Sequence, residues 1–310
     1  MKEKGRTMSG EIQAILIAGP TASGKSRLAM ELAERHHGAV VNADSLQVYD
    51  GLEILTARPS TEDLRRVPHH LYGHVDPRCD YSAGDYLRHA AETVATLRDN
   101  GRLPIFCGGT GLYFKALLGL LDEMPPIPQA LREKWRARLA AEGPEALHAE
   151  LVRIDPPTAQ RLRPRDGQRI ARALEVSEAT GRPISALQRG GGEGLIGPDR
   201  ARMIVLTPDR PELRRRIEER FDHMLEAGAL DEVRRFTARF PDAGVTAGKA
   251  IGVSEFSEFL YGRMTYEQAR ERAVIRTRQY AKRQDTWFRH QFDSRWQRIL
   301  PDNSAPIDKI

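Results

Sequence analysis

The sequence predicts an α/β fold, in which a parallel sheet carries helices on both faces and an all-helical insertion domain interrupts the core. Two observations lead to this prediction. In the N-terminal third, short apolar runs alternate with segments of helical spacing, which is the pattern of βαβ units. A proline-rich breaker at 124–128 is then followed by residues 129–181, which show helical periodicity alone. We therefore expect a core domain formed by residues 10–123 and 199–310, and a helical insertion at 124–198.

Four apolar runs are predicted to form the strands of the core, because short buried runs bounded by turn residues are typical of parallel strands. They lie at 14–18, 39–43, 103–107 and 203–206. Helices are expected at 26–34 and 86–98, where apolar residues recur every three or four positions. The second helix should stop at Asn100-Gly101, which is a typical helix end.

The insertion is predicted to be helical throughout. Asp166 is a plausible N-cap of its last long helix, and Gly181 is the expected residue just past the end of that helix. Residues 189–197 are rich in glycine, and we expect them to form a mobile linker that returns the chain to the sheet.

Residues 19–26, Gly-Pro-Thr-Ala-Ser-Gly-Lys-Ser, match the phosphate-binding pattern G-x-x-x-x-G-K-[ST]. The loop lies between a predicted strand and a predicted helix, as this pattern requires, so the core is expected to be P-loop NTPase-like. Backbone N–H groups of such a loop point at anionic oxygens at the helix N-terminus. Lys25 adds a positive charge, and the Ser26 hydroxyl can ligate Mg²⁺. The loop predicts a bound di- or triphosphate, as in nucleotide- and ATP-binding proteins, without indicating which group is transferred.

Two polar residues follow the next strands, at the sheet edge where ligands of open α/β folds collect. Asp44 comes just after the second predicted strand, and Thr110 lies in a second glycine loop, 108–111, after the third. Asp44 could hold Mg²⁺ through water, accept a proton from a nucleophile, or simply cap a helix. Thr110 could donate a hydrogen bond into the same crevice or cap the helix that begins at Leu112.

Composition favours a cytoplasmic protein without a membrane span. Cys79 and Cys107 are the only cysteines of the 310 residues, so neither a disulfide framework nor a cysteine-based zinc site is expected. No apolar run approaches the length of a span, and residues 1–13 lack an apolar targeting segment. The net charge of +5 is by itself weak evidence for a nucleic-acid partner.

The histidines do not predict a zinc site. His69, His70 and His74 have a spacing that two ligands could use. However, the chain has no cysteine pair and no H-E-x-x-H pattern, and Pro68 favours a loop over a ligand-bearing helix.

The C-terminal helix carries the stronger indication of a partner. Its start, Thr265 to Gln268, has the capping-box pattern. Arg276, Tyr280, Arg283 and Trp287 then recur along one stripe, and residues 270–295 contain eight basic and three acidic side chains. Arginines interleaved with aromatic rings suit phosphate contact and base stacking. The alternative is a solvated basic face whose aromatic rings pack inward.

Together these motifs resemble those of the bacterial tRNA dimethylallyltransferases, also called tRNA isopentenyltransferases. The matching segments follow the same order from about residue 13 to residue 290. They are residues 19–26, 42–49, 68–71, 81–83, 108–113, 166–176, 250–252, 277–284 and 286–289.

The resemblance implies transfer of a dimethylallyl group from dimethylallyl diphosphate to N6 of the adenosine just 3′ of a tRNA anticodon. It implies that the loop of Gly19, Pro20, Thr21, Ala22, Ser23, Gly24, Lys25 and Ser26 holds the diphosphate, with Mg²⁺ as the cofactor at Ser26. By the same resemblance Asp44 is the base, Thr110 touches the flipped-out adenosine, and Arg278 reaches the diphosphate. Contacts to the tRNA anticodon stem-loop are implied for Asp44, Ser45, Leu46, Gln47, Thr110, Arg132, Gln168, Arg169, Ile170, Ala171 and Arg172, and the basic helix adds Arg276 and Arg283.

Some positions depart from the family pattern. Leu55 stands where the family usually has glycine, Val253-Ser254 replaces a more usual Tyr-Arg or Tyr-Lys, and the glycine-rich stretch 190–197 is enlarged. Two other classes of function remain open: a P-loop enzyme acting on free adenylate or a small metabolite, and a non-catalytic RNA-binding protein. The insertion and the basic helix argue against the first, and intact Lys25, Ser26 and Asp44 argue against the second. We expect a monomer.

Overall fold

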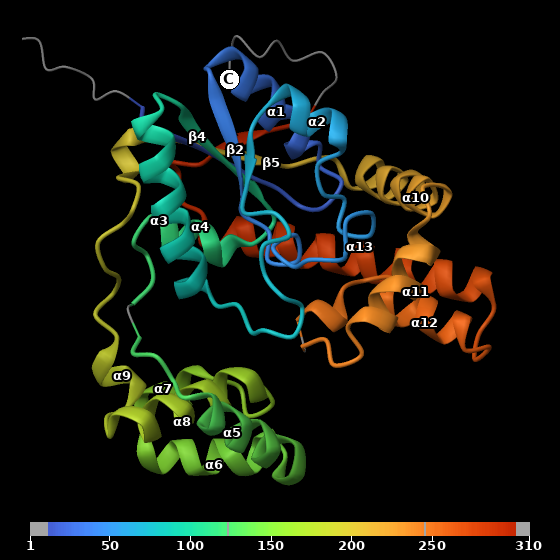
Figure 1. Cartoon of the computed structure of the whole chain (residues 1–310). Coiled ribbons are helices and arrows are strands. Elements are labelled where there is room, and N and C mark those ends of the chain that lie inside the picture. Colours follow the sequence, from blue (N-terminus) through green and yellow to red (C-terminus); the bar gives the residue numbers. More distant parts are fainter. Residues whose placement is uncertain (1–11, 123, 245, 302–310) are drawn as a thin grey trace, which may run out of the picture. The chain divides into compact units, whose positions relative to one another are not determined.

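The structure, a computed structural model, describes residues 12–122, 124–244 and 246–301. The chain falls into two units (Figure 1), one formed by the segments up to Leu118 and from Leu195 onward, the other by Gly119–Gly194. The sequence had placed the insertion at 124–198, so the structure begins and ends this unit a few residues earlier.

A six-stranded sheet, parallel throughout, forms the centre of the first unit. The strand order is β3-β2-β4-β1-β5-β6. The strands are β1 (Ala14–Ala18), β2 (Gly38–Asn42), β3 (His69–His70), β4 (Leu103–Gly108), β5 (Ala201–Leu206) and β6 (Gln297–Ile299). The four predicted strands are confirmed to within two residues at either end. The sequence did not predict β3 and β6, because strands of two and three residues leave no apolar run to detect.

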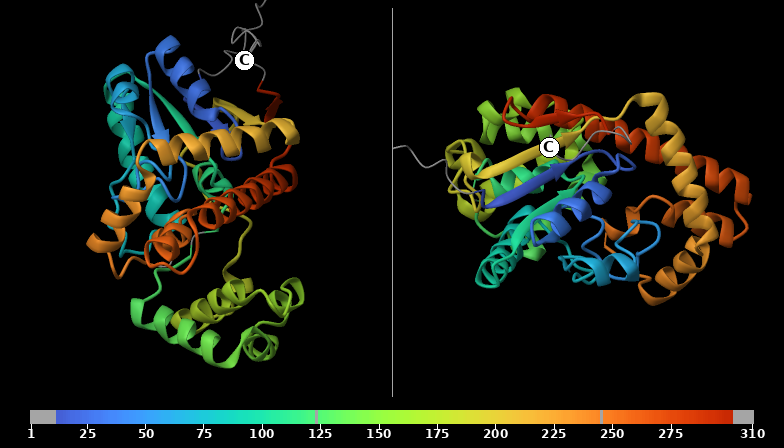
Figure 2. Two further views of the ribbon diagram at one scale, coloured as in Figure 1. Left: turned by 90° about the vertical axis from the view of Figure 1, so that its right-hand side faces the viewer. Right: turned by 90° about the horizontal axis from the view of Figure 1, so that it is seen from above.

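Helices cover both faces of this sheet, and the alternation along β1 shows how the two faces are divided (Figure 2). Ile15 and Ile17 pack with α1 (Lys25–Arg35) on one face. Leu16 and Ala18 face the other layer, which contains α3 (Ala83–Asp99), α4 (Gly111–Leu117) and part of α13 (Tyr266–Gln291). The short helix α2 (Thr61–Arg66) lies just before β3. The predicted α/β fold with helices on both faces is therefore confirmed.

A helical group beside the sheet has its own apolar cluster, which includes Ile217, Phe221 and Phe256. It consists of α10 (Arg210–Glu226), α11 (Ala229–Arg239), α12 (Val253–Leu260) and the first half of α13. The capping box predicted at Thr265 is present, since its hydroxyl accepts from the Gln268 N–H and the Gln268 side chain accepts from the Thr265 N–H. Within the described residues, no helix has the length and apolar character needed to cross a membrane.

The second unit is helical, as predicted, and packs around Trp135, Leu147 and Leu174. Its helices are α5 (Gln129–Glu142), α6 (Pro144–Ile154), α7 (Pro156–Arg161), α8 (Gly167–Thr180) and α9 (Ile184–Leu187). Asp166 and Gly181 flank α8 as predicted, and Gly181 has the left-handed φ of 65° typical of a helix end, but the Asp166 side chain makes no capping hydrogen bond.

The glycine-rich connection after α9 is hydrogen-bonded to the segment that enters this unit. The Asp122 carboxylate accepts from the backbone N–H groups of Arg189 and Gly191, at 2.6 and 3.0 Å. The Gly192 N–H donates to the Gly119 carbonyl at 2.9 Å. The two chain segments that lead in and out of the unit are therefore joined to each other, rather than forming independent linkers.

A buried carboxylate connects the helical group to the loop that follows β2. Glu232 in the first turn of α11 accepts three backbone hydrogen bonds, from the N–H groups of Glu53 and Ile54 at 2.7 Å and of Leu55 at 2.9 Å. Only 4% of this residue is exposed. Three backbone donors therefore depend on a single side chain, which fixes the path of residues 53–55.

Glu232→Ala should lower the free energy of unfolding by about 3 kcal/mol, because it leaves three backbone N–H groups without their charged acceptor. Urea unfolding followed by circular dichroism measures the change. Asp231→Ala is the matched control in the same helical turn, where the exposed pair with Arg234 is worth about 1 kcal/mol or less. Equal losses in the two variants would contradict the role assigned to Glu232.

Candidate functional site

Three loops meet at one edge of the sheet because β2, β4 and β1 are adjacent and parallel. Their carboxyl ends lead into the Asp44 segment, the glycine loop of Thr110 and the phosphate loop 19–26. The structure thus brings together the three features that the sequence placed at separate strand ends. The strand order explains why these loops meet: β4 lies between β1 and β2 in the sheet, although it follows both of them in the chain.

The phosphate loop has the backbone geometry that its glycines and small residues permit. Gly24 precedes α1 with a φ of 87°, and Ala22 also has a positive φ, 62°. A Cβ on Gly19 would lie 2.6 Å from Oγ of Ser23, so the first glycine allows the loop to fold closely on itself. The Ser23 N–H donates to the Pro20 carbonyl at 3.2 Å. The loop therefore forms a tight turn that leads directly into the N-terminus of α1.

Lys25 lies at the centre of the charges in this site. Its Nζ donates to the Pro20 carbonyl at 3.2 Å. Burial lowers the Lys25 pKa, the neighbouring Cys107 and the negative charge of Asp44 oppose that shift, and the positive charge of Arg220 adds to it. Burial also raises the pKa of the Cys107 thiol to about 11, so this thiol is neutral at pH 7. A partly desolvated cation with one nearby carboxylate attracts an anionic ligand strongly.

The Asp44 carboxylate accepts a hydrogen bond from a backbone N–H group two residues along the chain. It does not cap a helix, because the residues that follow it form a turn. Its Oδ1 accepts from the Leu46 N–H at 2.9 Å, while the Asp44 N–H donates to Oδ1 of Asn42 at 2.9 Å. A Cβ built on Gly109 would lie 3.2 Å from Oδ2 of Asp44. One carboxylate oxygen is thus used locally, and the other faces the glycine loop after β4.

Thr110 joins that glycine loop to the Asp44 segment. Its Oγ1 accepts from the Ser45 N–H at 2.9 Å and donates to the Ser45 hydroxyl at 3.2 Å. Thr110 occupies the N-cap position of α4, but its side chain makes no capping bond there. The hydroxyl therefore orients the segment after β2 instead of capping the helix.

Gln284 connects two of these loops, and the sequence reading did not single it out. Its Oε1 accepts from the Thr21 N–H at 2.9 Å, and its Nε2 donates to the Gly109 carbonyl at 3.0 Å. The residue is buried on α13. The available signal was its place in the segment 277–284, which matched the family pattern as a whole.

Two arginines of α10 also reach the site without having been predicted. If Gly24 carried a Cβ, the nearest heavy atom would be Nη1 of Arg216, at 3.9 Å. Arg220 lies near Asp44, whose charge raises the Arg220 pKa against a larger lowering by burial. They recur four positions apart, so they lie on one face of the helix. This four-residue spacing was the only feature of the sequence that could have placed the two arginines together.

A small cavity of about 70 Å³ opens between the phosphate loop and α10. Asp44, Arg220 and Tyr280 give it a polar end, and the negative charge of Asp44 adds to burial in raising the Tyr280 pKa. The remaining lining is mostly apolar: Ala22, Leu46, Leu55, Ile217, Phe221, Met224, Ala250 and Ile251, with Thr21, Thr56 and Thr277. The cavity therefore combines an ionic end with a hydrocarbon-lined end.

A second cavity, of about 410 Å³, lies on the other side of Ile217, which lines both. Pro20 of the phosphate loop forms part of its wall, together with the basic side chains of Arg210, Arg214, Arg278 and Lys282. Arg278 forms an ion pair with Glu218 of α10. The predicted diphosphate ligand Arg278 thus lines the same cavity as Pro20 of the phosphate loop, whose wall also contains Asp285 and apolar side chains.

A Mg²⁺ ion at this site would take only a few of its ligands from the protein. Ser26 begins the first turn of α1 beside Lys25, and its side chain hydrogen-bonds Cys107. Across residues 12–122, 124–244 and 246–301, no three His, Cys, Asp or Glu side chains gather into a metal-binding group. Mg²⁺ typically uses one or two protein oxygens and takes the rest from phosphates and water. Ser26, with Asp44 nearby, fits that donor set once a diphosphate is bound.

The residues of the basic stripe on α13 have different surroundings in the structure. Arg276 pairs with the buried Glu255, and Arg283 is exposed with its guanidinium 5.9 Å from the centre of the Tyr280 ring. Trp287 packs inward, since a Cβ on Gly111 would lie 1.9 Å from its ring. The aromatic members thus face the core or the cavity, as in the inward-packing alternative.

In the second unit, the predicted RNA-contacting residues differ in exposure. Gln168 and Arg169 are exposed on α8 and Arg172 is half-buried, whereas Ile170 and Ala171 are buried in the core of the unit. Arg132 is half-buried on α5. Any side-chain contact made by the 168–172 segment must therefore come from its polar members.

The chain matches two family descriptions, IPP transferase over residues 47–291 and Isopentenyl transferase over residues 12–72. It is 57% identical to a tRNA dimethylallyltransferase of Rhizobium johnstonii over 288 residues, which are 93% of this chain and 97% of the relative. It is 55% identical to the protein of the same description in Sinorhizobium medicae over 294 residues, 95% of this chain and 96% of the relative.

Solved structures show the same likeness. A full-length tRNA isopentenylpyrophosphate transferase of Bacillus halodurans matches with a TM-score of 0.68 and 33% identity, over 96% of this chain and 94% of that one. A eukaryotic dimethylallyltransferase acting on tRNA matches with a TM-score of 0.74 and 29% identity, over 89% of this chain and 69% of that one.

Gln284→Leu should weaken pyrophosphate binding about tenfold, because the Thr21 N–H and the Gly109 carbonyl lose their shared partner and the loop loses an anchor. Isothermal titration calorimetry measures the affinity. Gln291→Leu is the control on the same helix, where the amide oxygen accepts a hydrogen bond from Lys115, away from the phosphate loop. An affinity unchanged in Gln284→Leu would show that the bridge does not order the loop.

Proposed function

The chain belongs to the IPP transferase family of tRNA dimethylallyltransferases, and we propose that the three loops at the sheet edge form its catalytic site. The enzyme is a prenyltransferase that modifies tRNA: it moves a dimethylallyl group from its diphosphate to N6 of the adenosine 3′ of the anticodon. The observation that carries the assignment of the site is the small cavity, in which Asp44 meets the phosphate loop at one end of an apolar wall.

The phosphate loop holds the diphosphate of the donor in this proposal. Its backbone N–H groups and Lys25 supply positive potential at the N-terminus of α1, where anions bind well. Arg216 and Arg220 approach from α10. Negative charge on the diphosphate grows as the allylic C–O bond breaks, so fixed positive groups stabilise the transition state more than the ground state.

The apolar end of the cavity accepts the five-carbon tail. Leu55, Ile217, Phe221, Met224 and Ile251 line it, and together they exclude water from a carbon that develops positive charge. The larger cationic cavity next to Pro20 offers a path for an anionic donor. Arg278 there would exchange Glu218 for a phosphate oxygen as the donor arrives.

Asp44 acts as the base. The lone pair of the adenine N6 is delocalised into the ring, so this amine is a poor nucleophile, and removal of its proton during attack is valuable. In the reaction the N6–C1 bond forms, the C1–O bond breaks, its electron pair leaves with the diphosphate, and the N6 proton passes to Oδ2 of Asp44. The hydrogen bond from Leu46 to Oδ1 orients the carboxylate for this step.

Ser26, with diphosphate oxygens and water, would hold the Mg²⁺ ion, which supplies Lewis-acid stabilisation to the leaving group when bound. Thr110, in the glycine loop where the flipped-out base would approach, fixes the Asp44 segment through the hydrogen bonds of its hydroxyl to Ser45. The base must leave its stack, since N6 is not accessible within a stacked anticodon loop.

In this proposal each unit contributes RNA contacts of its own: the first unit through the segment 44–47 and the exposed Arg283, the second through the polar residues of α8. Gln47 supports the segment 44–47 from within, because its amide donates to the carbonyls of Thr56 and Ala57. Free adenylate would require neither the exposed basic residues of α13 nor the second unit, so no observation favours the adenylate enzyme or the small-metabolite kinase.

Asp44→Asn should slow single-turnover prenylation by about 10²- to 10⁴-fold, because the amide cannot accept the proton. It keeps an oxygen for the Leu46 N–H, so the local turn and the tRNA affinity should be retained. Rapid-quench assays with labelled donor and a filter-binding assay with unmodified tRNA measure the two quantities. Asp50→Asn is the control, since Asp50 pairs with Arg239 outside the site. A normal rate in Asp44→Asn would exclude Asp44 as the base.

Leu55→Ala should change donor selection. Leu55 lines the cavity and packs on Gly252, where a Cβ would lie 2.6 Å from its Cδ2. Its removal makes room for a longer tail, so the ratio of kcat/KM for geranyl diphosphate over dimethylallyl diphosphate should rise about tenfold or more. The exposed Leu64→Ala serves as the control. If the ratio stays the same in Leu55→Ala, the apolar end of the cavity does not hold the tail.

A further inference from the structure

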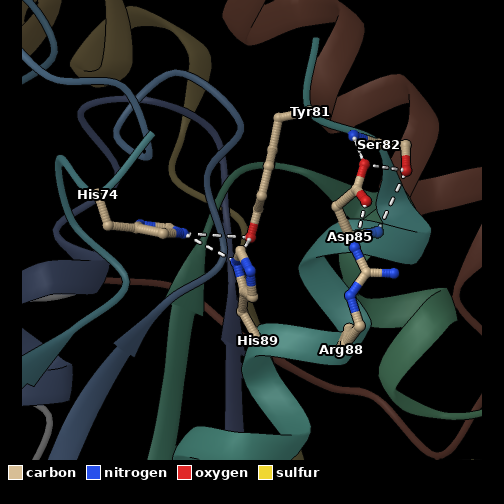
Figure 3. A network of polar contacts seen from close by, with 6 residues as sticks. All are labelled: His74, Tyr81, Ser82, Asp85, Arg88 and His89. Carbon is tan, nitrogen blue, oxygen red and sulfur yellow. Dashed lines mark hydrogen bonds and ion pairs between the residues drawn. The ribbon is translucent and has the colours of Figure 1, made fainter. Parts of the chain in front are cut away.

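Two histidines and a tyrosine converge outside the proposed catalytic site (Figure 3). Nε2 of His74 lies 3.2 Å from Oη of Tyr81 and 3.3 Å from Nδ1 of His89, and the Tyr81 Oη lies 2.9 Å from the same Nδ1. The three atoms form a triangle with sides between 2.9 and 3.3 Å. Spacing in the sequence had grouped His74 with His69 and His70, but the structure pairs it with His89, fifteen positions further along.

The local fold fixes two of these side chains before any ligand binds. Ser82 begins α3 with a capping box, in which its hydroxyl accepts from the Asp85 N–H and the Asp85 carboxylate accepts from the Ser82 N–H. Tyr81 immediately precedes this cap and His89 lies in the second turn, so both side chains are set by the start of one helix. The His74 ring meets the other two rings edge-on, at interplanar angles of 85° and 70°.

Hydrogen bonds can join the three groups in the absence of an ion: the phenol donates to Nε2 of His74 and accepts from the Nδ1–H group of His89. His74 also makes a hydrogen bond to the Leu71 backbone. Because its Nε2 is the atom that faces Tyr81 and His89, that bond falls to Nδ1–H and leaves a lone pair on Nε2. A backbone carbonyl on the far nitrogen is the arrangement that orients histidines in metal sites.

We propose that His74 Nε2, His89 Nδ1 and Tyr81 Oη form a site for a divalent transition-metal ion of the zinc class. Two ligands at the usual zinc–nitrogen distance of about 2.0–2.1 Å are about 3.3 Å apart in a tetrahedral arrangement. The two imidazole nitrogens already have this separation. Imidazole is a ligand for zinc, cobalt, nickel and copper, whereas Mg²⁺ prefers oxygen ligands, so the site is chemically distinct from the one proposed at Ser26.

Access and charge suit this ion. His74 is exposed and the other two residues are half-buried, so water can complete the coordination. The Arg58 guanidinium lies near His74 and repels a cation, but it pairs with Glu53 at 3.8 Å. Asp85 and Glu92 place negative charge near Tyr81, while Arg88, which pairs with Asp85, places positive charge there.

A metal ion bound by His74, His89 and Tyr81 would restrain the segment that carries Asp44. The loop that contains His74 is hydrogen-bonded to that segment, since the Asn42 amide donates to the Leu71 carbonyl at 3.0 Å and the Gly73 N–H donates to the Gln47 carbonyl at 2.9 Å. A metal that joins His74 to α3 therefore ties this loop to a rigid helix. The expected effect is stabilisation of the protein, because the ion binds the folded state and not the separated ligands.

The experiment titrates Co²⁺ into the full chain in the presence of excess Mg²⁺, follows the visible absorption of bound cobalt, and then displaces it with Zn²⁺. We expect one saturable ion per chain and a rise in Tm. His74→Ala and His89→Gln should each weaken binding at least tenfold and abolish the rise in Tm. Tyr81→Phe keeps both imidazoles and should weaken binding less.

Two controls locate the ion. Cys79→Ser tests the exposed thiol between His74 and Tyr81, and His223→Ala tests an exposed histidine on α10. Both should bind Co²⁺ as the unaltered chain does, and thermal unfolding in EDTA verifies that every variant is folded. Absence of saturable binding, binding unchanged in His74→Ala or Tyr81→Phe, or binding lost in Cys79→Ser would each overturn the proposal.

Discussion

The parallel pairing of β2 with β4 and of β4 with β1 is the constraint on which the site depends. It brings the phosphate loop, the Thr110 loop and the Asp44 segment to one edge of the sheet, although Gly19 and Thr110 are 91 positions apart in the chain. Gln284 then joins two of the loops from α13. The same pairing requires close backbone contact, because a Cβ on Gly108 would lie 1.9 Å from the Ala43 carbonyl oxygen.

The electrostatics follow from that convergence. Lys25 is half-buried near Cys107, Asp44 and Arg220, and burial of its ammonium group lowers its pKa. A diphosphate that enters this environment restores the missing counter-charge, and departure of an anionic leaving group is favoured at the same point. Glu232, outside the cavity, positions Leu55 on the opposite wall through the backbone. The polar and apolar ends of the cavity are thus held by different parts of the fold.

Much of the fold and part of the site could be predicted from the sequence, for physical reasons that differ between elements. The strand at 14–18 and its loop are local features, in which an apolar run and a stringent spacing identify both the fold and the ligand. Gln284, Arg216 and Glu232 could not be predicted in their roles, because each acts across more than a hundred positions in the chain. The contact of His74 with His89 was not predicted either, although only fifteen positions separate them, since it depends on where α3 begins. The inward packing of Trp287 was one of two open alternatives, and its contacts with Gly111 and with the Phe292 ring distinguish them.

The central claim is that the phosphate loop holds a leaving diphosphate while carbon is transferred to nitrogen. The most direct measurement mixes the protein and Mg²⁺ with dimethylallyl diphosphate labelled in its carbon chain, and offers unmodified tRNA and AMP as separate acceptors. The account predicts label in N6 of one tRNA adenosine, an equal amount of pyrophosphate and no inorganic phosphate. Label in AMP alone, or release of inorganic phosphate without any labelled RNA, would contradict it.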